Sequence, residues 1–124
     1  MKKVKTGELT GAALDLAVAK ANEDTCAVWN GKVVDQWTNP YTPSDDWGVG
    51  GPIIEREKIA IDAEMGDVWR AKMEYTNDDS FDSQWSEENG PTPLIAAMRC
   101  FVASKLGDEV DVPDELVEAT IKSV

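Results

Sequence analysis

The fold is decided by residues 92–107, which read TPLIAAMRCFVASKLG. Thr92 can cap a helix, and Pro93 fits the first turn, where its missing N–H costs no hydrogen bond. Gly107 can end the helix, since glycine adopts the left-handed conformation of many helix ends. The apolar residues between them recur at helical spacing, which predicts a helix with one face in the core. This face consists of Leu94, Ile95, Met98, Phe101, Val102 and Leu106.

A second helix and a hairpin are predicted towards the N-terminus. Thr10 can cap a helix that runs to Lys20, with small and apolar residues on most of its faces. Residues 25–29 and 32–37 read as two strands around Asn30-Gly31. Asn-Gly tolerates the two positive φ values of a type I′ turn, so this pattern predicts a β-hairpin.

The middle of the chain is less regular. Residues 38–52 are rich in turn formers and predict a loop longer than ordinary connections. Residues 53–61 are predicted to be extended, and residues 68–75 alternate between apolar and charged side chains as a strand does. The turn at 62–66 joins these two segments into a second hairpin.

The remaining segments complete the predicted architecture. The acidic residues 76–89 predict a loop or an edge strand, with Phe81 and Trp85 tethering it to the core. A short helix is expected to open at Pro113 and to carry Leu116. The sequence thus predicts a single α+β domain over residues 1–124, in which antiparallel β-hairpins pack with an N-terminal helix and a C-terminal core helix.

Composition excludes several classes of function. The 124 residues include no histidine, so Ser-His and Cys-His nucleophile pairs and the commonest zinc ligand are absent. Cys26 and Cys100 lie far apart in apolar surroundings without a C-x-x-C motif, which favours two buried thiols over a disulfide. No segment has the length of a signal peptide core or a membrane span, so a cytoplasmic location is expected.

The excess of acidic side chains affects which partners the protein can bind. The chain has 24 acidic and 12 basic side chains and a formal net charge of −12. Direct nucleic-acid binding is disfavoured, because phosphate contacts normally supply most of its affinity. The charge could attract a basic protein surface or imitate DNA. It could also serve only as a solvated surface that aids solubility.

Most catalytic motifs are absent from this sequence or incomplete in it. Asp78-x-Ser80-x-Asp82 begins like a calcium loop but lacks the later glycine and glutamate. Glu55 and Glu57 would share one face of a strand, where they could hold Mg²⁺ in a nucleotide hydrolase; alternating solvated charge explains them as well. We therefore expect a protein without catalytic residues, resident metal or cofactor.

Two elements are candidates for ligand binding. Trp37, Tyr41 and Trp47 lie within eleven residues of one another, next to glycines whose backbone a ligand could approach. Aromatic rings stack on bases, although the rings could instead cover the edge of the core. The start of the helix at Thr92 leaves N–H groups and a positive dipole end that suit a phosphate. Arg99 could balance its charge, or could pair with the acidic surface.

Three parts of the chain carry a family resemblance: residues 9–15 (LTGAALD), residues 43–47 with 50–57 (PSDDW and GGPIIERE), and residues 90–99 followed by 102–110 (GPTPLIAAMR and VASKLGDEV). Together they resemble the NinX family of small phage and prophage proteins. The order of the segments is that of the family, whereas residues 63–89 match poorly. The family is a domain of unknown function among phage accessory genes, so the resemblance implies no activity. Accessory proteins of this size often antagonise host defence.

The leading hypothesis is a non-enzymatic phage protein that binds a small nucleotide-like ligand, and so sequesters a host defence signal that is NAD-derived or a cyclic nucleotide. A homo-oligomer is expected, since a small chain encloses a ligand best at a subunit interface. The alternative is an acidic inhibitor or DNA mimic that blocks a basic surface of a host defence protein. The expected ligand-binding residues are Trp37, Tyr41, Ser44, Trp47, Gly50, Gly51, Arg56, Thr92 and Arg99.

Overall fold

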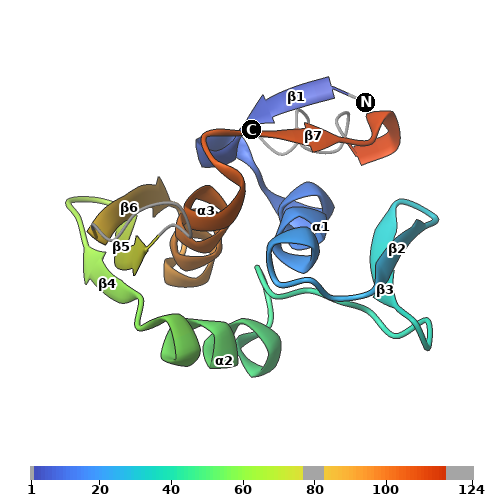
Figure 1. The fold of residues 1–124 in the computed structure, drawn as a ribbon, viewed down its shortest axis with the longest axis horizontal. Helices are drawn as coiled ribbons and strands as arrows, with labels where there is room; N and C mark the ends of the chain where they lie inside the picture. Colours follow the sequence, from blue (N-terminus) through green and yellow to red (C-terminus); the bar gives the residue numbers. More distant parts are fainter. Residues whose placement is uncertain (1, 77–82, 117–124) are drawn as a thin grey trace.

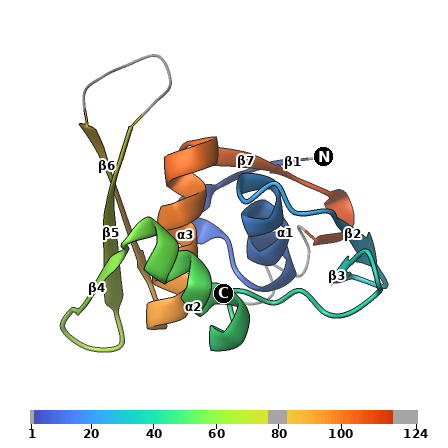
Figure 2. The same cartoon turned by 60° about the horizontal axis from the view of Figure 1, so that its bottom comes forward.

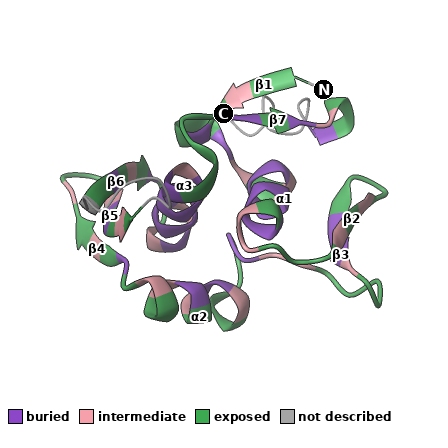
Figure 3. Ribbon diagram, in the orientation of Figure 1, coloured by how far each residue is buried: buried purple, intermediate pink, exposed green. Residues whose placement is uncertain are grey.

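A central helix, α3, organises the computed structural model, which describes residues 2–76 and 83–116. Helix α3 (Pro93–Leu106) lies between a three-stranded sheet on one side and helix α1 (Gly11–Ala21) on the other (Figure 1). A view from another side shows the long β5–β6 hairpin beside α3 (Figure 2). Buried residues concentrate on α1 and α3 (Figure 3), so the core lies around these two helices. The architecture is α+β, as predicted.

The ends of α3 are those that the sequence predicts. The hydroxyl of Thr92 accepts a hydrogen bond from the Ile95 amide at 3.1 Å, and Pro93 occupies the first turn. Gly107 follows the helix with a φ of +90°. Met98, Phe101 and Val102 have no exposed surface, which confirms the predicted core face.

Helix α1 and the first hairpin also confirm their predictions. Thr10 is the N-cap residue of α1, although its hydroxyl makes no capping hydrogen bond to the helix, and seven of the eleven helical residues are buried. Strands β2 (Cys26–Trp29) and β3 (Lys32–Asp35) pair in antiparallel fashion. Asn30 and Gly31 join them with φ values of +53° and +74°. The hairpin lies beyond α1, away from the larger sheet (Figure 1).

The larger sheet has the antiparallel order β4-β5-β6, with strands β4 (Ala60–Ala63), β5 (Trp69–Thr76) and β6 (Ser83–Gly90). The acidic segment predicted as loop or edge thus contains an edge strand. Trp85 does not tether it to the core: the ring is 60% exposed, and the Lys72 ammonium group lies 4.8 Å from its centroid. Phe81 falls outside the described residues.

The prediction of extended structure at 53–61 is wrong for residues 53–57, whereas residues 60–61 do lie in strand β4, which forms the predicted second hairpin with β5. Residues Trp47–Glu57 form helix α2, so the predicted loop at 38–52 ends at its N-terminus. Asp46 caps this helix by accepting a hydrogen bond from the Gly48 amide at 2.8 Å. Ile53 is 3% exposed, and its burial outweighs the low helix propensity of three glycines and Pro52. In a helix, Glu55 and Glu57 point in nearly opposite directions, which removes the shared strand face on which the magnesium hypothesis relied.

The two chain ends pair in a way that the sequence did not predict. Strand β1 (Lys2–Lys5) is antiparallel to β7 (Glu109–Val112), and the short 3₁₀ helix η1 (Thr6–Glu8) follows β1. The Thr6 hydroxyl donates to the Gly107 carbonyl oxygen at 2.6 Å, which ties η1 to the end of α3. Leu116 is fully buried, but most of the helix predicted from Pro113 lies outside the described residues.

Both cysteines are free thiols, as predicted. Cys100 is fully buried on α3, whereas Cys26 is only partly buried. Within the described part of the chain, no helix is both long enough and apolar enough to cross a membrane.

Candidate functional site

A small hollow lies where α2 and α3 both begin. We call it the Trp47 hollow: a cavity of about 170 Å³ between the loop before α2 and the first turn of α3. Its lining consists of Ser44, Asp45, Trp47, Thr92, Pro93, Leu94 and Ile95. The hollow therefore brings together three of the residues predicted for ligand binding, namely Ser44, Trp47 and Thr92.

Two residues that line this hollow have backbone amides without a hydrogen-bond partner in the described part of the chain. The Gly48 amide is used by the Asp46 carboxylate, and the Ile95 amide by the Thr92 hydroxyl. The amides of Trp47 and Leu94 make no hydrogen bond to any residue in 2–76 or 83–116. Both belong to the first turn of a helix, where free N–H groups and the helix dipole favour an anion.

The ring of Trp47 is exposed enough to bind. It is the first residue of α2, and 54% of its surface is accessible. An indole in this position can stack on a planar ring without first leaving the core. No lysine or arginine lines the hollow, and Asp45 contributes a carboxylate to it. The attraction for an anion thus comes from backbone amides alone.

Ser44 lines the hollow and links the loop before α2 to α1. It is buried, and its amide donates to Asp15 Oδ1 at 2.9 Å. Asp15 is itself only 4% exposed, and burial raises the pKa of its carboxyl group to about 6 despite the hydrogen bonds from Ser44 that lower it. The polar atoms of Ser44 are therefore directed to α1, and Ser44 fixes the loop that leads into Trp47.

The two glycines of α2 have different surroundings. A Cβ atom built on Gly50 would lie 2.4 Å from the Pro43 carbonyl oxygen and 2.7 Å from Leu94 Cδ1. The close approach predicted for a ligand at Gly50 is thus made by the chain itself. Gly51 has nothing within 4 Å of such an atom.

Trp37 and Tyr41 lie together in a different cavity, of about 370 Å³, beside the β2–β3 hairpin. The Tyr41 hydroxyl donates to Asp24 Oδ2 at 2.7 Å. Burial and this carboxylate raise the pKa of Tyr41. These two rings therefore do not face the same cavity as Trp47, contrary to the single aromatic site that the sequence suggested.

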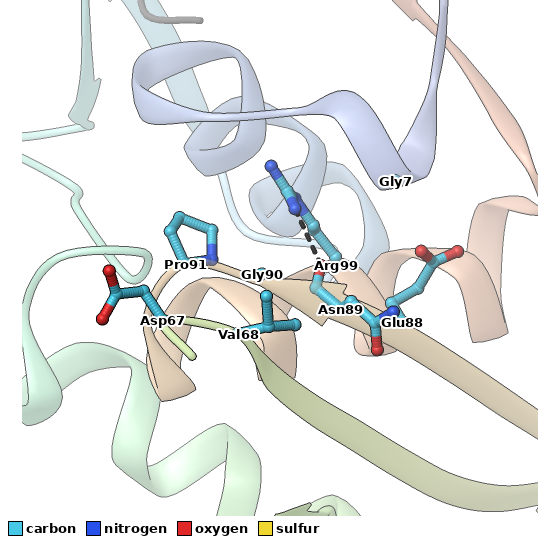
Figure 4. Close-up of a pocket in the computed structure, with 8 residues that line it drawn as sticks. All are labelled: Gly7, Asp67, Val68, Glu88, Asn89, Gly90, Pro91 and Arg99. Atoms are coloured by element: carbon cyan, nitrogen blue, oxygen red, sulfur yellow. Dashed lines mark hydrogen bonds between the residues drawn. The ribbon is translucent and has the colours of Figure 1, made fainter. Parts of the chain in front are cut away.

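The Arg99 side chain lies in a third cavity, of about 410 Å³, at the end of β6 (Figure 4). Its Nε donates to the Leu9 carbonyl oxygen at 2.8 Å and its Nη1 to that of Asn89 at 2.7 Å. Burial lowers the pKa of Arg99, and the nearby Glu88 and Glu8 carboxylates oppose this effect. Arg99 thus joins the segment before α1 to the sheet and does not face the Trp47 hollow.

Glu88 lines the same cavity as Arg99, together with Asp67 (Figure 4). Burial raises the pKa of Glu88, Arg99 lowers it, and Asp108 raises it further. With two carboxylates beside one guanidinium group, this cavity is a poor site for a phosphate.

Arg56 is held at the opposite end of α2. Its Nη2 donates to Asn22 Oδ1 at 2.6 Å and its Nε to Glu57 Oε2 at 2.8 Å. Its guanidinium carbon also lies 5.7 Å from the centroid of the Phe101 ring. Neither arginine predicted to balance a ligand's charge therefore lines the Trp47 hollow.

Sequence reasoning missed two residues that shape this site. Asp46 before a helix is an N-cap signal, but the glycines and the proline that follow it predict a loop in place of a helix. Asp15 gives no local signal, since its burial depends on a loop about 30 residues away. Among residues 2–76 and 83–116, no group of three or more Cys, Asp or Glu side chains is arranged to hold a metal ion. The calcium-like motif at 78–82 falls outside these residues.

Comparison with known proteins places the chain in a family. A search of curated proteins found no match. The family model described as Bacteriophage P22, NinX matches residues 5–105, which include α1, α2, all of α3 but its last residue, and the Trp47 hollow. The chain belongs to the NinX family of phage proteins.

Proposed function

We propose that this NinX protein is a non-enzymatic accessory protein that binds a small nucleotide-like ligand in the Trp47 hollow and so removes a host defence signal from solution. One observation carries the proposal: a half-exposed indole lies beside two unused amides at the starts of two helices. This pairing of a stacking surface with anion-binding donors matches the two chemical parts of a nucleotide.

The energies of these contacts suit reversible capture. Stacking of a base on an aromatic side chain is worth about 1 to 3 kcal/mol. A helix N-terminus adds about 0.3 to 1 kcal/mol for a nearby negative charge. Because Asp45 opposes an anion and no cation compensates for it, the proposed ligand carries few charges, such as a cyclic nucleotide with a single phosphodiester. Polyphosphates are disfavoured.

The size of the hollow bears on how the ligand is enclosed. At about 170 Å³ it is smaller than the roughly 300 to 1,000 Å³ of most small-molecule sites. One chain would therefore cover only part of a nucleotide. A second copy that closes over the exposed part would complete the site, which is the physical reason for proposing a homo-oligomer.

The test is retention of unchanged ligand. Purified protein is incubated with cyclic mononucleotides, cyclic dinucleotides and NAD-derived nucleotides, separated from free ligand by gel filtration and heated to release what it holds. We expect at least one nucleotide to be retained and released intact, and Trp47→Ala to lose it. Trp85→Ala is the matched control, since Trp85 is similarly exposed but lies on β6. The proposal would be refuted if the wild type retained none of the nucleotides, or if Trp47→Ala and Trp85→Ala retained them equally.

A second candidate function is inhibition of a host defence protein through its basic surface. Trp29 and Trp37 are 61% and 70% exposed, and the chain has a net charge of −12. Exposed tryptophans are common energetic centres of protein interfaces, and acidic charge favours a basic partner. Under this function Trp47→Ala retains full activity, whereas joint neutralisation of five carboxylates abolishes it, namely Asp78, Asp79, Asp82, Glu87 and Glu88.

A further inference from the structure

The cavity that holds Trp37 and Tyr41 has a chemistry of its own. We call it the Trp37 pocket; it occupies about 370 Å³ between the end of α1 and the β2–β3 hairpin. Its lining consists of Glu23, Asp24, Thr25, Cys26, Asp35, Gln36, Trp37 and Tyr41. None of these residues lines the Trp47 hollow, so the pocket stands apart from the proposed nucleotide site.

The pocket is strongly negative. Glu23, Asp24 and Asp35 bring three carboxylates to it, and none of its lining residues is a lysine or arginine. None of the three forms an ion pair with another described residue. Burial raises the pKa of the Cys26 thiol, and the Asp24 and Asp35 carboxylates raise it further. A phosphate or carboxylate ligand would be repelled here.

Hydrogen bonds hold the turn that carries Trp37 and the ring of Tyr41. Asp35 Oδ1 accepts hydrogen bonds from the amides of Trp37 at 2.9 Å and Asn39 at 3.0 Å, which fixes the turn after β3. Asp24 Oδ2 accepts from the Tyr41 hydroxyl and fixes the second ring. Trp37 nevertheless leaves 70% of its surface exposed. A tryptophan side chain has only two torsion angles, so it loses little conformational entropy when a partner covers it.

We propose that the Trp37 pocket receives an arginine side chain from a basic segment of a partner protein. A guanidinium group stacks on an indole face and pairs with carboxylates at the same time, and its aliphatic stem packs on apolar surface. Asp24 and Asp35 each keep one carboxylate oxygen that accepts no hydrogen bond from a described residue, and both residues line the pocket together with Trp37. The inference rests on the second candidate function, to which it gives a site and a partner chemistry.

The experiment uses a fluorescein-labelled peptide of alternating glycine and arginine, with both ends blocked, and measures its binding by fluorescence anisotropy at low salt. We expect Trp37→Ala to weaken binding about twofold to fivefold, the range typical of a cation over an exposed indole. Trp85→Ala should bind as the wild type does. Trp37→Phe should keep part of the affinity, which separates loss of the ring's contribution from damage to the turn.

The contribution of the pocket's carboxylates is tested with two variants, each of which removes one negative charge. Glu23→Gln should weaken binding about threefold, the effect of one partly screened carboxylate. Glu55→Gln, on exposed surface of α2, should leave binding unchanged. Absence of any peptide binding would overturn the inference. Equal affinities for Glu23→Gln and Glu55→Gln, together with an unaffected Trp37→Ala, would also overturn it, because net charge alone would then hold the peptide.

These outcomes remain distinct from those of the proposed functions. Nucleotide retention by Trp37→Ala should equal that of the wild type, since Trp37 does not line the Trp47 hollow. If a basic host protein binds the wild type and Trp37→Ala equally, inhibition through acidic charge survives and the Trp37 pocket is excluded as its site. A thermal melt of each variant confirms that it is folded.

Discussion

Replacement of Asp15 by asparagine should stabilise the protein at neutral pH and leave its stability unchanged in acid. The Asp15 carboxyl group is 4% exposed, and burial raises its pKa from 3.8 to about 6. A folded pKa above the unfolded value means that the contribution of this group to stability is fully present below pH 3.8. It is lost as the pH rises through 6. The difference between the folded and unfolded pKa corresponds to a loss of about 3 kcal/mol in the free energy of unfolding at pH 7 and above.

The asparagine side chain keeps an acceptor for the Ser44 amide and removes the buried charge. Urea unfolding of the wild type and Asp15→Asn at several pH values from 3.5 to 8 measures the difference in the free energy of unfolding. We expect a gain of about 1 to 3 kcal/mol at pH 8 that falls to near zero at pH 3.5. Glu55→Gln, which makes the same change in net charge on exposed surface, should show no such gain. A pH-independent difference, or a variant less stable at pH 8, would contradict the assigned cause.

Other predictions follow from packing and burial. Gly50→Ala should lower the free energy of unfolding by at least about 2 kcal/mol, because its Cβ atom would collide with backbone. Gly51→Ala, its control in the same helix, should be neutral or stabilising by up to about 1 kcal/mol, and denaturant curves that rank the two alike would refute the packing argument. Arg99→Met should cost about 2 to 4 kcal/mol, since two backbone carbonyls lose their donor; unchanged stability would mean that water replaces the guanidinium group. Burial raises the pKa of Cys100 to about 11, so iodoacetamide at pH 8 should modify Cys26 first and Cys100 only in urea, as followed by mass spectrometry. Modification of both thiols together in the native protein would contradict this assignment.

The elements that were correctly predicted carry their signals locally. Helix α3 has a cap, a proline in its first turn and a glycine after its end, all within residues 92–107. The β2–β3 hairpin has Asn-Gly at the two positions that require positive φ. In each case the conformation depends on residues that are neighbours in the chain, so a single sequence contains the information.

Helix α2 and the β1–β7 pair could not be found in this way. Helix α2 contains three glycines and Pro52, which lower helix propensity, and it forms because Ile53 and Gly50 fit closely against the core. Strands β1 and β7 lie at opposite ends of the chain, and their partner choice depends on the fold that brings these ends together. Tertiary packing outweighs local preference at both places.

The same distinction between local signals and tertiary packing applies to the candidate site. The Thr92 cap was predictable because it is part of a local helix start, and Trp47 was predictable as an aromatic residue in a turn-rich segment. That these two residues share one hollow depends on how α2 packs on α3, as does the separation of Trp47 from Trp37. Sequence proximity placed three rings in one site, whereas the fold distributes them between two cavities with different charge.

Because Trp37 and Tyr41 do not line the Trp47 hollow, one chain offers only one ring to a nucleotide. The proposed capture of a nucleotide therefore depends on self-association. A single Trp47 hollow has one ring, two free amides and about 170 Å³, so a ligand bound there remains partly in solvent and dissociates readily. Tight retention therefore requires a second surface over the ligand, and a second copy of the chain is the partner that is always present. If so, the ligand and the homo-oligomer stabilise each other, because binding at a shared interface is linked to association. Light scattering across a concentration series should then show more dimer with ligand than without it, and a monomer that holds its ligand through gel filtration would disprove this linkage.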